Sequence, residues 1–189
     1  LAASAVGYNN TAGGVGSSTI GYNNTATNEN ASAFGYGNTA GGLASSAFGF
    51  SNTASGDNAN AFGYNNIASG SKSNVFGTGN TVSGSSSTAV GTANEVAAEN
   101  STAIGNNNTI SSGAENSAAL GNNISISLKD SVALGNNSTA TAINSVTGNS
   151  SYTKWAGVSD VVGVVSVGSS GATRQIQNVA AGQVSATST

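Results

Sequence analysis

The chain repeats one short pattern of polar and apolar positions ten times: a small or polar residue, a small residue that is usually Ala, a bulky apolar residue, and Gly. Ser46-Ala47-Phe48-Gly49 is one copy. Eight of the nine spacings between successive Gly residues are 14, and the other is 16. The repeated residues are Gly7, Gly21, Gly35, Gly49, Gly63, Gly77, Gly91, Gly105, Gly121 and Gly135. A short fixed period predicts a solenoid, in which one structural unit stacks on copies of itself.

Each 14-residue unit contains two pieces that read as short β-strands. The first piece ends at the Gly, and the second follows an Asn-Thr pair such as Asn52-Thr53. Gly, Ser and Asn residues between the pieces supply turns. The unit therefore predicts one coil of an all-β parallel β-roll, whose coils pair about 4.8 Å apart. The residue five positions after each Gly, such as Ala54, is expected to face inward in the second strand.

The first strand carries apolar residues on both faces, because its Ala and its bulky residue are neighbours and neighbouring side chains point to opposite faces. We expect the bulky residue to fill the roll, with Phe48 buried and stacked on Phe34 and Phe62, and with Phe76 in the same structural column. The other apolar residues then form an exposed stripe along the roll. Such a stripe predicts that the chain associates with copies of itself.

Composition excludes several classes of function. Only 6% of the residues are charged, with four basic and seven acidic residues and a net charge of −3, so no basic field is available for nucleic acid or an anionic membrane. The chain has no His and no Cys, and its acidic residues are scattered, so neither an enzyme active site nor a metal or cofactor site is expected. Glu95 and Glu99 could pair, but we favour the interpretation that they are two solvated turn residues.

The residue after each Gly is the best candidate for contact with a partner. It is aromatic in the first five units and becomes Thr or Asn from residue 78 onward. The aromatic residues are Tyr8, Tyr22, Tyr36, Phe50 and Tyr64. Aromatic side chains dominate protein contacts because they offer a large area with few rotatable bonds. We therefore predict ligand binding here, with packing against the roll or a neighbouring subunit as the alternative.

Two further columns have a structural and a functional interpretation. An Asn lies three residues after most Gly residues, as in Asn38, and can either bond the coils above and below or form a binding face; we favour the structural role. A Thr follows this Asn in most units and resembles the Thr rows of ice-binding solenoids. Ile67 and Glu95 interrupt the Thr column, so ice binding is the weaker hypothesis.

The period changes toward the end of the chain. The 16-residue spacing places two extra residues in the corner between Ser111 and Asn116. Residues 144–148 look like one more coil, residues 149–162 break the phase and contain Trp155, and the phase resumes at residues 165–168.

The repeats resemble a known family at the residues that carry the period. Asp130-Ser131-Val132-Ala133-Leu134-Gly135 and Asn100-Ser101-Thr102-Ala103-Ile104-Gly105 resemble the head repeats of trimeric autotransporter adhesins, the YadA-like head. Residues 165–182 resemble the neck of that family. The resemblance implies a homotrimer of left-handed parallel β-rolls. It also implies three parts: head repeats over 1–148, a head insert over 149–162, and a last coil and neck over 163–189 that lead to a coiled-coil stalk.

The same resemblance implies a bacterial adhesin head that is displayed from the outer membrane and contributes to virulence. The expected partners are host matrix proteins of the collagen, fibronectin and laminin class, cells or abiotic surfaces, with no nucleic acid and no insertion into a membrane. A structural spacer within a surface fibre is the alternative. Structural roles are expected for Phe34, Phe48, Phe62, Phe76, Trp155 and Arg174. Among these, Trp155 would anchor the insert between subunits, and Arg174 would hold an acid or a carbonyl group in the neck.

Overall fold

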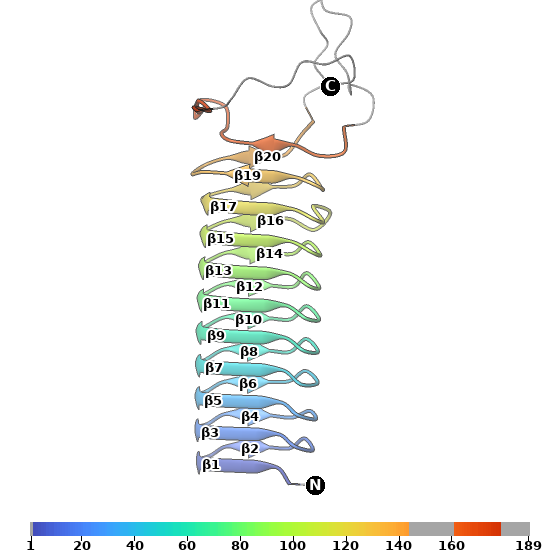
Figure 1. Ribbon diagram of the computed structural model, residues 1–189. Coiled ribbons are helices and arrows are strands. Elements are labelled where there is room, and N and C mark those ends of the chain that lie inside the picture. The colour runs from blue at the N-terminus through green and yellow to red at the C-terminus, as the bar shows by residue number, and fades with distance from the viewer. Residues whose placement is uncertain (1, 144–160, 179–189) are drawn as a thin grey trace, which may run out of the picture.

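The computed structural model describes residues 2–143 and 161–178, and over these ranges the chain winds into a parallel β-solenoid (Figure 1). Each coil adds one strand to each of two sheets, which face each other along the roll. Odd-numbered strands form an 11-stranded sheet, and even-numbered strands form a 10-stranded sheet. The described residues contain no helix. The all-β parallel roll predicted from the period is therefore confirmed.

The strands of the larger sheet are β1 (Ser4–Tyr8), β3 (Ser18–Tyr22), β5 (Ser32–Tyr36), β7 (Ser46–Phe50), β9 (Asn60–Tyr64), β11 (Asn74–Thr78), β13 (Thr88–Thr92), β15 (Thr102–Asn106), β17 (Ala118–Asn122), β19 (Val132–Leu134) and β21 (Val165–Ser166). Those of the smaller sheet are β2 (Thr11–Ala12), β4 (Thr25–Ala26), β6 (Thr39–Ala40), β8 (Thr53–Ala54), β10 (Ile67–Ala68), β12 (Thr81–Val82), β14 (Glu95–Val96), β16 (Thr109–Ile110), β18 (Ser125–Ile126) and β20 (Thr139–Ala140).

Equivalent residues of successive coils pair with one another. Ala47 of β7 pairs with Ala61 of β9, for example, and Gly49 pairs with Gly63. Left-handed residues turn the chain between the strands, such as Asn65 with a φ of 53°. Asn tolerates this conformation better than most residues, which explains its frequency at the corners.

The two extra residues of the longer unit lie between β16 and β17, as predicted. Ile104 still pairs with Leu120 across this point, and Ile110 still pairs with Ile126. The corner absorbs the added length, so neither sheet loses its register.

Small residues fill the inside of the roll. Ala33, Ala47 and Ala61 of the larger sheet are fully buried, and they face fully buried residues of the smaller sheet. The inward position predicted for the second strand is confirmed, because Ala54 and Ile110 at this position are both fully buried.

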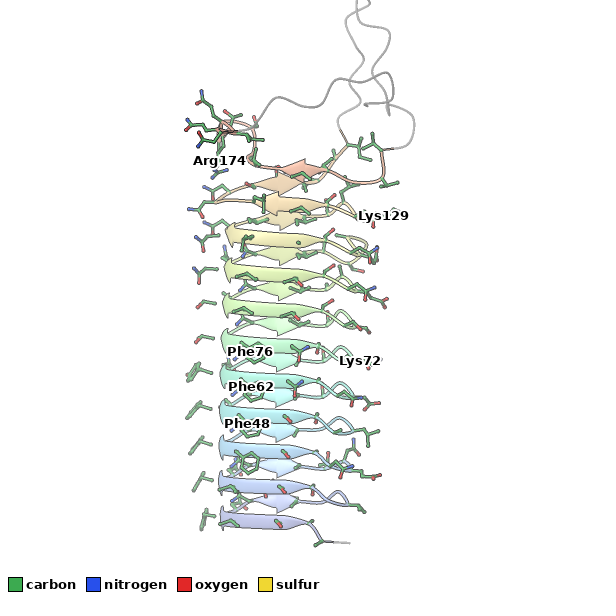
Figure 2. The ribbon with its side chains drawn as sticks, viewed as in Figure 1. Phe48, Phe62, Lys72, Phe76, Lys129 and Arg174 are labelled. Atoms are coloured by element: carbon green, nitrogen blue, oxygen red, sulfur yellow. The ribbon has the colours of Figure 1, made fainter. Side chains whose placement is uncertain are left out.

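The prediction that Phe48 fills the roll is wrong. Phe48 is half-buried on the outer face of the larger sheet, and its neighbour Ala47 takes the inner position. A coil of 14 residues brings its two strands too close for a ring between them, so the smaller side chain of each pair turns inward. The predicted stacking is confirmed: the ring centroid of Phe48 lies 4.7 Å from that of Phe34 and 5.0 Å from that of Phe62. Figure 2 shows this stack continuing to Phe76, which is exposed.

The solenoid resumes after residues 144–160. Strand β21 pairs with β19, with Val165 opposite Val132 and Ser166 opposite Ala133. The resumption of phase at residues 165–168 is therefore confirmed. The coil expected at residues 144–148 and the residue Trp155 lie outside the described residues.

Candidate functional site: a stacked aromatic column

Five aromatic rings form a continuous stack at the ends of the odd-numbered strands. We call Tyr8, Tyr22, Tyr36, Phe50 and Tyr64 the aromatic column. Successive ring centroids lie 4.8–5.2 Å apart, and the ring planes differ by 4–14°. Each ring is 42–68% exposed. The structure thus brings together all five residues that the sequence nominated for ligand binding and leaves them open to solvent.

The Gly before each ring explains how the rings come so close. Gly35 has a φ of +120°, and a Cβ at this residue would lie 2.1 Å from the carbonyl oxygen of Gly49 in the next coil. Only Gly permits both this conformation and this approach of two backbones. The strands stay paired through the Gly, so Tyr36 lies directly opposite Phe50. The ring spacing therefore follows from the strand spacing.

Later coils build the same corner without aromatic residues. Thr78 pairs in register with Tyr64, so the backbone continues unchanged where the aromatic column ends. Farther along, the Nδ2 of Asn106 donates to the Oδ1 of Asn122 at 2.7 Å, and the Nδ2 of Asn122 donates to the Oδ1 of Asn136 at 2.9 Å. A ladder of amides replaces the stack of rings, so the fold does not require an aromatic residue at this position.

A second set of apolar side chains lies two residues earlier on the same strands. We call Val6, Ile20, Phe34, Phe48, Phe62, Phe76, Val90, Ile104, Leu120 and Leu134 the apolar column. Val6 is 58% exposed and Leu120 is 51% exposed, whereas the three middle Phe residues are half-buried. The apolar column runs along the outer face of the larger sheet for the full height of the regular coils. These are the bulky residues of the repeat, which the sequence analysis expected to find inside the roll.

The Asn column, from Asn10 to Asn108, is structural. The Oδ1 of Asn38 accepts hydrogen bonds from the backbone N–H and the Nδ2 of Asn52, both at 3.0 Å. The Nδ2 of Asn38 donates to the carbonyl oxygens of Phe34 at 2.9 Å and Gly49 at 2.7 Å. Asn24 to Asn108 are buried throughout this column. Their polar atoms are used within the roll, so they offer no binding face.

The Thr column faces outward from the even-numbered strands. Thr25, Thr39 and Thr53 are half-buried, and Ile67 and Glu95 interrupt the column as exposed residues. The column is one residue wide, because each of these strands is two residues long and its second residue points inward. A flat, regular hydroxyl surface of the ice-binding kind is therefore absent from the described coils.

Arg174 folds back over the last coil. It donates hydrogen bonds to the carbonyl oxygen of Val167 at 2.8 Å, to the carbonyl oxygen of Asn136, and to the Oγ of Ser138 at 3.2 Å. Figure 2 places Arg174 at the top of the roll, whereas Lys72 and Lys129 lie along the opposite edge. These contacts tie the segment after β21 to the coil formed by β19 and β20.

The described residues contain no group of three or more His, Cys, Asp or Glu residues that could hold a metal ion. Glu95 lies in β14 and Glu99 lies in the turn that follows, and both side chains are exposed. Over the same residues, no helix has the length and hydropathy needed to cross a membrane. The aromatic column presents its five rings to solvent, and the apolar column presents further large side chains on the same strands.

Sequence reasoning found the aromatic column and all the positions of the apolar column, but it placed the apolar column inside the roll. Residue size indicates which position faces inward. The residue two positions before each Gly is almost always Ala, and a narrow coil requires a small residue on its inner face. Constancy and small size mark the inner face, whereas the bulky position varies among Phe, Val, Ile and Leu.

One comparison with known proteins gives a match. The family model described as "YadA head domain repeat (2 copies)" matches residues 12–38, 40–66, 83–108 and 129–146, which together make up more than half of the chain. These ranges cover most of the regular coils and stop before β21. No curated protein sequence matches the chain.

Proposed function

Because this chain belongs to the YadA head repeat family, we propose that it is the head of a trimeric autotransporter adhesin. Family membership supports an adhesin-type surface fibre with a structural and binding role rather than a catalytic one. Our finer proposal is that the head is displayed from the bacterial outer membrane. There it attaches the cell to host matrix proteins of the collagen, fibronectin and laminin class, to host cells or to abiotic surfaces.

The apolar column supports association of the chain with copies of itself, and the family resemblance supplies the rest of the proposal, a homotrimer of left-handed rolls. It is a continuous stripe of large aliphatic and aromatic residues, which is exposed at Ile20, Ile104 and Leu120 and half-buried at its three middle Phe residues. Stripes of this kind on a soluble chain mark an interaction surface. Packing of three equivalent stripes about a common axis removes them from water. It also adds a second apolar layer, outside the roll, to a chain whose own core consists mainly of Ala.

The aromatic column carries the adhesion proposal. It presents the same exposed contact in five consecutive coils, and the fold does not need it, since Thr78 and Asn106 occupy the equivalent position later in the roll. Three copies of the head would display three such columns. Each contact can be weak, because a second contact made by an already attached head benefits from a high effective concentration.

The C-terminal part is proposed as an insert and a neck. In this proposal residues 1–148 form the head repeats, residues 149–162 form the insert that Trp155 anchors, and residues 163–189 form the last coil and the neck. The contacts of Arg174 with Asn136 and Val167 support a neck that is fastened to the roll. Such a fastening also covers the end of a solenoid, whose last strand otherwise presents an open edge.

Substitution within the aromatic column tests the proposal. The purified protein is screened for binding to collagen, fibronectin, laminin and bare hydrophobic surfaces, and the positive surfaces are then tested with a variant in which Tyr22, Tyr36 and Tyr64 are changed to Thr. We expect binding to fall at least tenfold while the melting temperature is retained, since later coils use Thr at this position.

The matched control changes Thr25, Thr39 and Thr53 to Ser on the outer face of the smaller sheet, and it should bind as the parent does. Adhesion that persists in the Tyr variant would contradict the proposal, as would a collapse of stability. A parent that binds none of the surfaces would favour the spacer, and a parent that reshapes ice crystals would favour the ice-binding alternative.

A further inference from the structure

We propose that Tyr8, Tyr22 and Tyr36 form an oxidative cross-linking site, in which one-electron oxidation joins the ring of Tyr22 to that of Tyr8 or Tyr36 as dityrosine. The proposal rests on the geometry of the rings and on their exposure. It does not depend on adhesion or on the nature of any ligand.

The three phenol rings already stack on one another. The ring centroids of Tyr8 and Tyr22 lie 5.2 Å apart with an interplanar angle of 14°, and those of Tyr22 and Tyr36 lie 5.0 Å apart with an angle of 8°. In-register pairing of β1, β3 and β5 holds these distances. A radical that forms on one ring therefore always has another phenol in contact with it.

The rings are also accessible from solvent. Tyr8 is 68% exposed, Tyr22 is 44% exposed and Tyr36 is 47% exposed, so an external oxidant can reach all three. Each ring lies next to the corner that follows its Gly, with open solvent on its outer side. Coupling requires two rings to leave the stacked arrangement and bring their ortho carbons together, and exposed rings can make this rotation on a fast timescale.

The sequence confines the site to these three residues among the described tyrosines. Phe50 follows Tyr36 in the column at 4.8 Å and cannot form a phenoxyl radical. Tyr64 stacks on Phe50 at 5.2 Å, and its neighbour on the other side is Thr78. Tyr64 is as exposed as its counterparts but has no phenol in the adjacent coils, so it serves as an internal control.

The chemistry balances with hydrogen peroxide and a peroxidase as the oxidant. Each of two Tyr side chains gives up one electron and one proton, which reduces one peroxide to two water molecules. The two radicals combine through a new carbon–carbon bond between their ortho carbons. The hydrogens on these carbons then move to the oxygens, which restores both phenols. The product is the protein with two fewer hydrogen atoms for each cross-link.

A cross-link would fasten neighbouring coils at one end of the described roll. The coils are otherwise joined near this edge by strand pairing, ring stacking and amide hydrogen bonds, such as that from the Nδ2 of Asn9 to the Oδ1 of Asn23. A covalent bond between residues 14 positions apart closes a short loop, so the coils can no longer separate while the chain unfolds. Oxidants would thus stabilise this end of the roll against unfolding through the three tyrosines of the aromatic column.

The experiment uses the full chain with Tyr152 changed to Phe, because Tyr152 lies outside the described residues. A haem peroxidase and hydrogen peroxide are added, dityrosine is detected by its fluorescence, and the protein is digested with a protease that cleaves after acidic residues. Cleavage at Glu29, Asp57 and Glu95 separates residues 1–29, 30–57 and 58–95. We expect residues 1–29 to lose two hydrogens and also to appear joined to residues 30–57.

Two variants and one mixing control decide the outcome. Tyr22→Phe should abolish the fluorescence, because Tyr8 and Tyr36 are then two coils apart; Phe50 shows that this column accepts Phe. Tyr64→Phe should leave the yield unchanged. When isotopically light and heavy protein are mixed before oxidation, joined peptides should carry a single label. The proposal would be overturned if no dityrosine formed, or if the dityrosine yield survived Tyr22→Phe. It would also be overturned by cross-links that contain residues 58–95 or by joined peptides that carry both labels.

Discussion

The Oδ1 of Asn38 accepts two hydrogen bonds from Asn52, one from its backbone N–H and one from its side-chain amide, each at 3.0 Å. Asn52 repeats this arrangement with Asn66 at 3.1 and 3.0 Å. Each buried amide therefore forms hydrogen bonds with the coil before it and the coil after it. The ladder resembles the stacked Asn side chains of cross-β assemblies, but here it lies within one chain.

Removal of one amide from this ladder should destabilise the roll. Asn52→Ala removes the acceptor of Asn66 and the donor to the carbonyl oxygens of Phe48 and Gly63. We expect a loss of about 2–4 kcal/mol in the free energy of unfolding per chain, measured by chemical denaturation, because several buried polar groups lose a partner. Asn65→Ser is the control, since Asn65 is an exposed corner residue and Ser51 adopts the same left-handed conformation one coil earlier. A loss no larger than that of the control would contradict this role.

Gly63→Ala should prevent the coils from stacking. Gly63 has a φ of +124°, and a Cβ at this residue would lie 2.1 Å from the carbonyl oxygen of Gly77. We expect destabilisation of at least about 3 kcal/mol, seen as a large fall in melting temperature or as insoluble protein.

Gly79→Ala is the matched control for this Gly substitution. Gly79 also has a positive φ, of +64°, but a Cβ there meets nothing within 4 Å. Ala93 adopts a φ of 54° at the equivalent position one coil later. The cost should stay within about 1 kcal/mol. If the two substitutions destabilised the protein equally, the cause would be the positive φ that both Gly residues share, and not the close approach of Gly63 to the carbonyl oxygen of Gly77.

A charge in the apolar column should separate the subunits of the proposed trimer. Light scattering on the parent should give three times 18.1 kDa. Ile104→Asp should shift the mass toward one chain, because an unpaired carboxylate would be buried among apolar residues. Thr53→Glu adds the same charge on the smaller sheet, where Glu95 already occupies the equivalent column, and should leave the mass unchanged. A parent that is a stable monomer at micromolar concentration would contradict the trimer.

Loss of Arg174 should loosen the last coil selectively. Arg174→Ala removes the donors to Val167, Asn136 and Ser138. Hydrogen bonds from a charged group are each worth about 1.5–3 kcal/mol, so amide hydrogen exchange in β19 and β21 should speed up at least tenfold. Exchange in β7 should not change. If Arg174→Ala changed the exchange rates of β19 and β21 no more than those of β7, Arg174 would not fasten the segment after β21.

The repeat period was sufficient to predict the architecture. A strand at each Gly, the inward position of Ala54 and the extra length between β16 and β17 all follow from where small, bulky and polar residues recur. The predicted strand end was wrong by one residue, because the odd-numbered strands from β1 to β17 continue to the residue after the Gly. The period works because every coil must place equivalent residues opposite one another to keep its hydrogen bonds. It also identified the aromatic column, since the residue after each Gly recurs once per coil at the end of a strand.

The inside of the roll could not be predicted from alternation alone. Alternation separates Ala47 from Phe48 but does not say which faces inward, and hydrophobicity suggested the larger residue. The width of the coil determines which of the two residues faces inward. This width depends on the geometry of the turns, which the pattern of polar and apolar positions does not specify. Contacts of Arg174 with Asn136 were equally out of reach, because they join residues 38 positions apart across a segment that breaks the period.

The corner that leads from an even-numbered strand to the next odd-numbered strand accepts added length without disturbing either sheet. It absorbs two extra residues between β16 and β17, and Val164, just before β21, still bonds to Ser131, 33 residues earlier. Foreign loops grafted into this corner should therefore be displayed at chosen heights along a rigid rod. Natural length variation should collect at the same edge and leave the aromatic side unaltered.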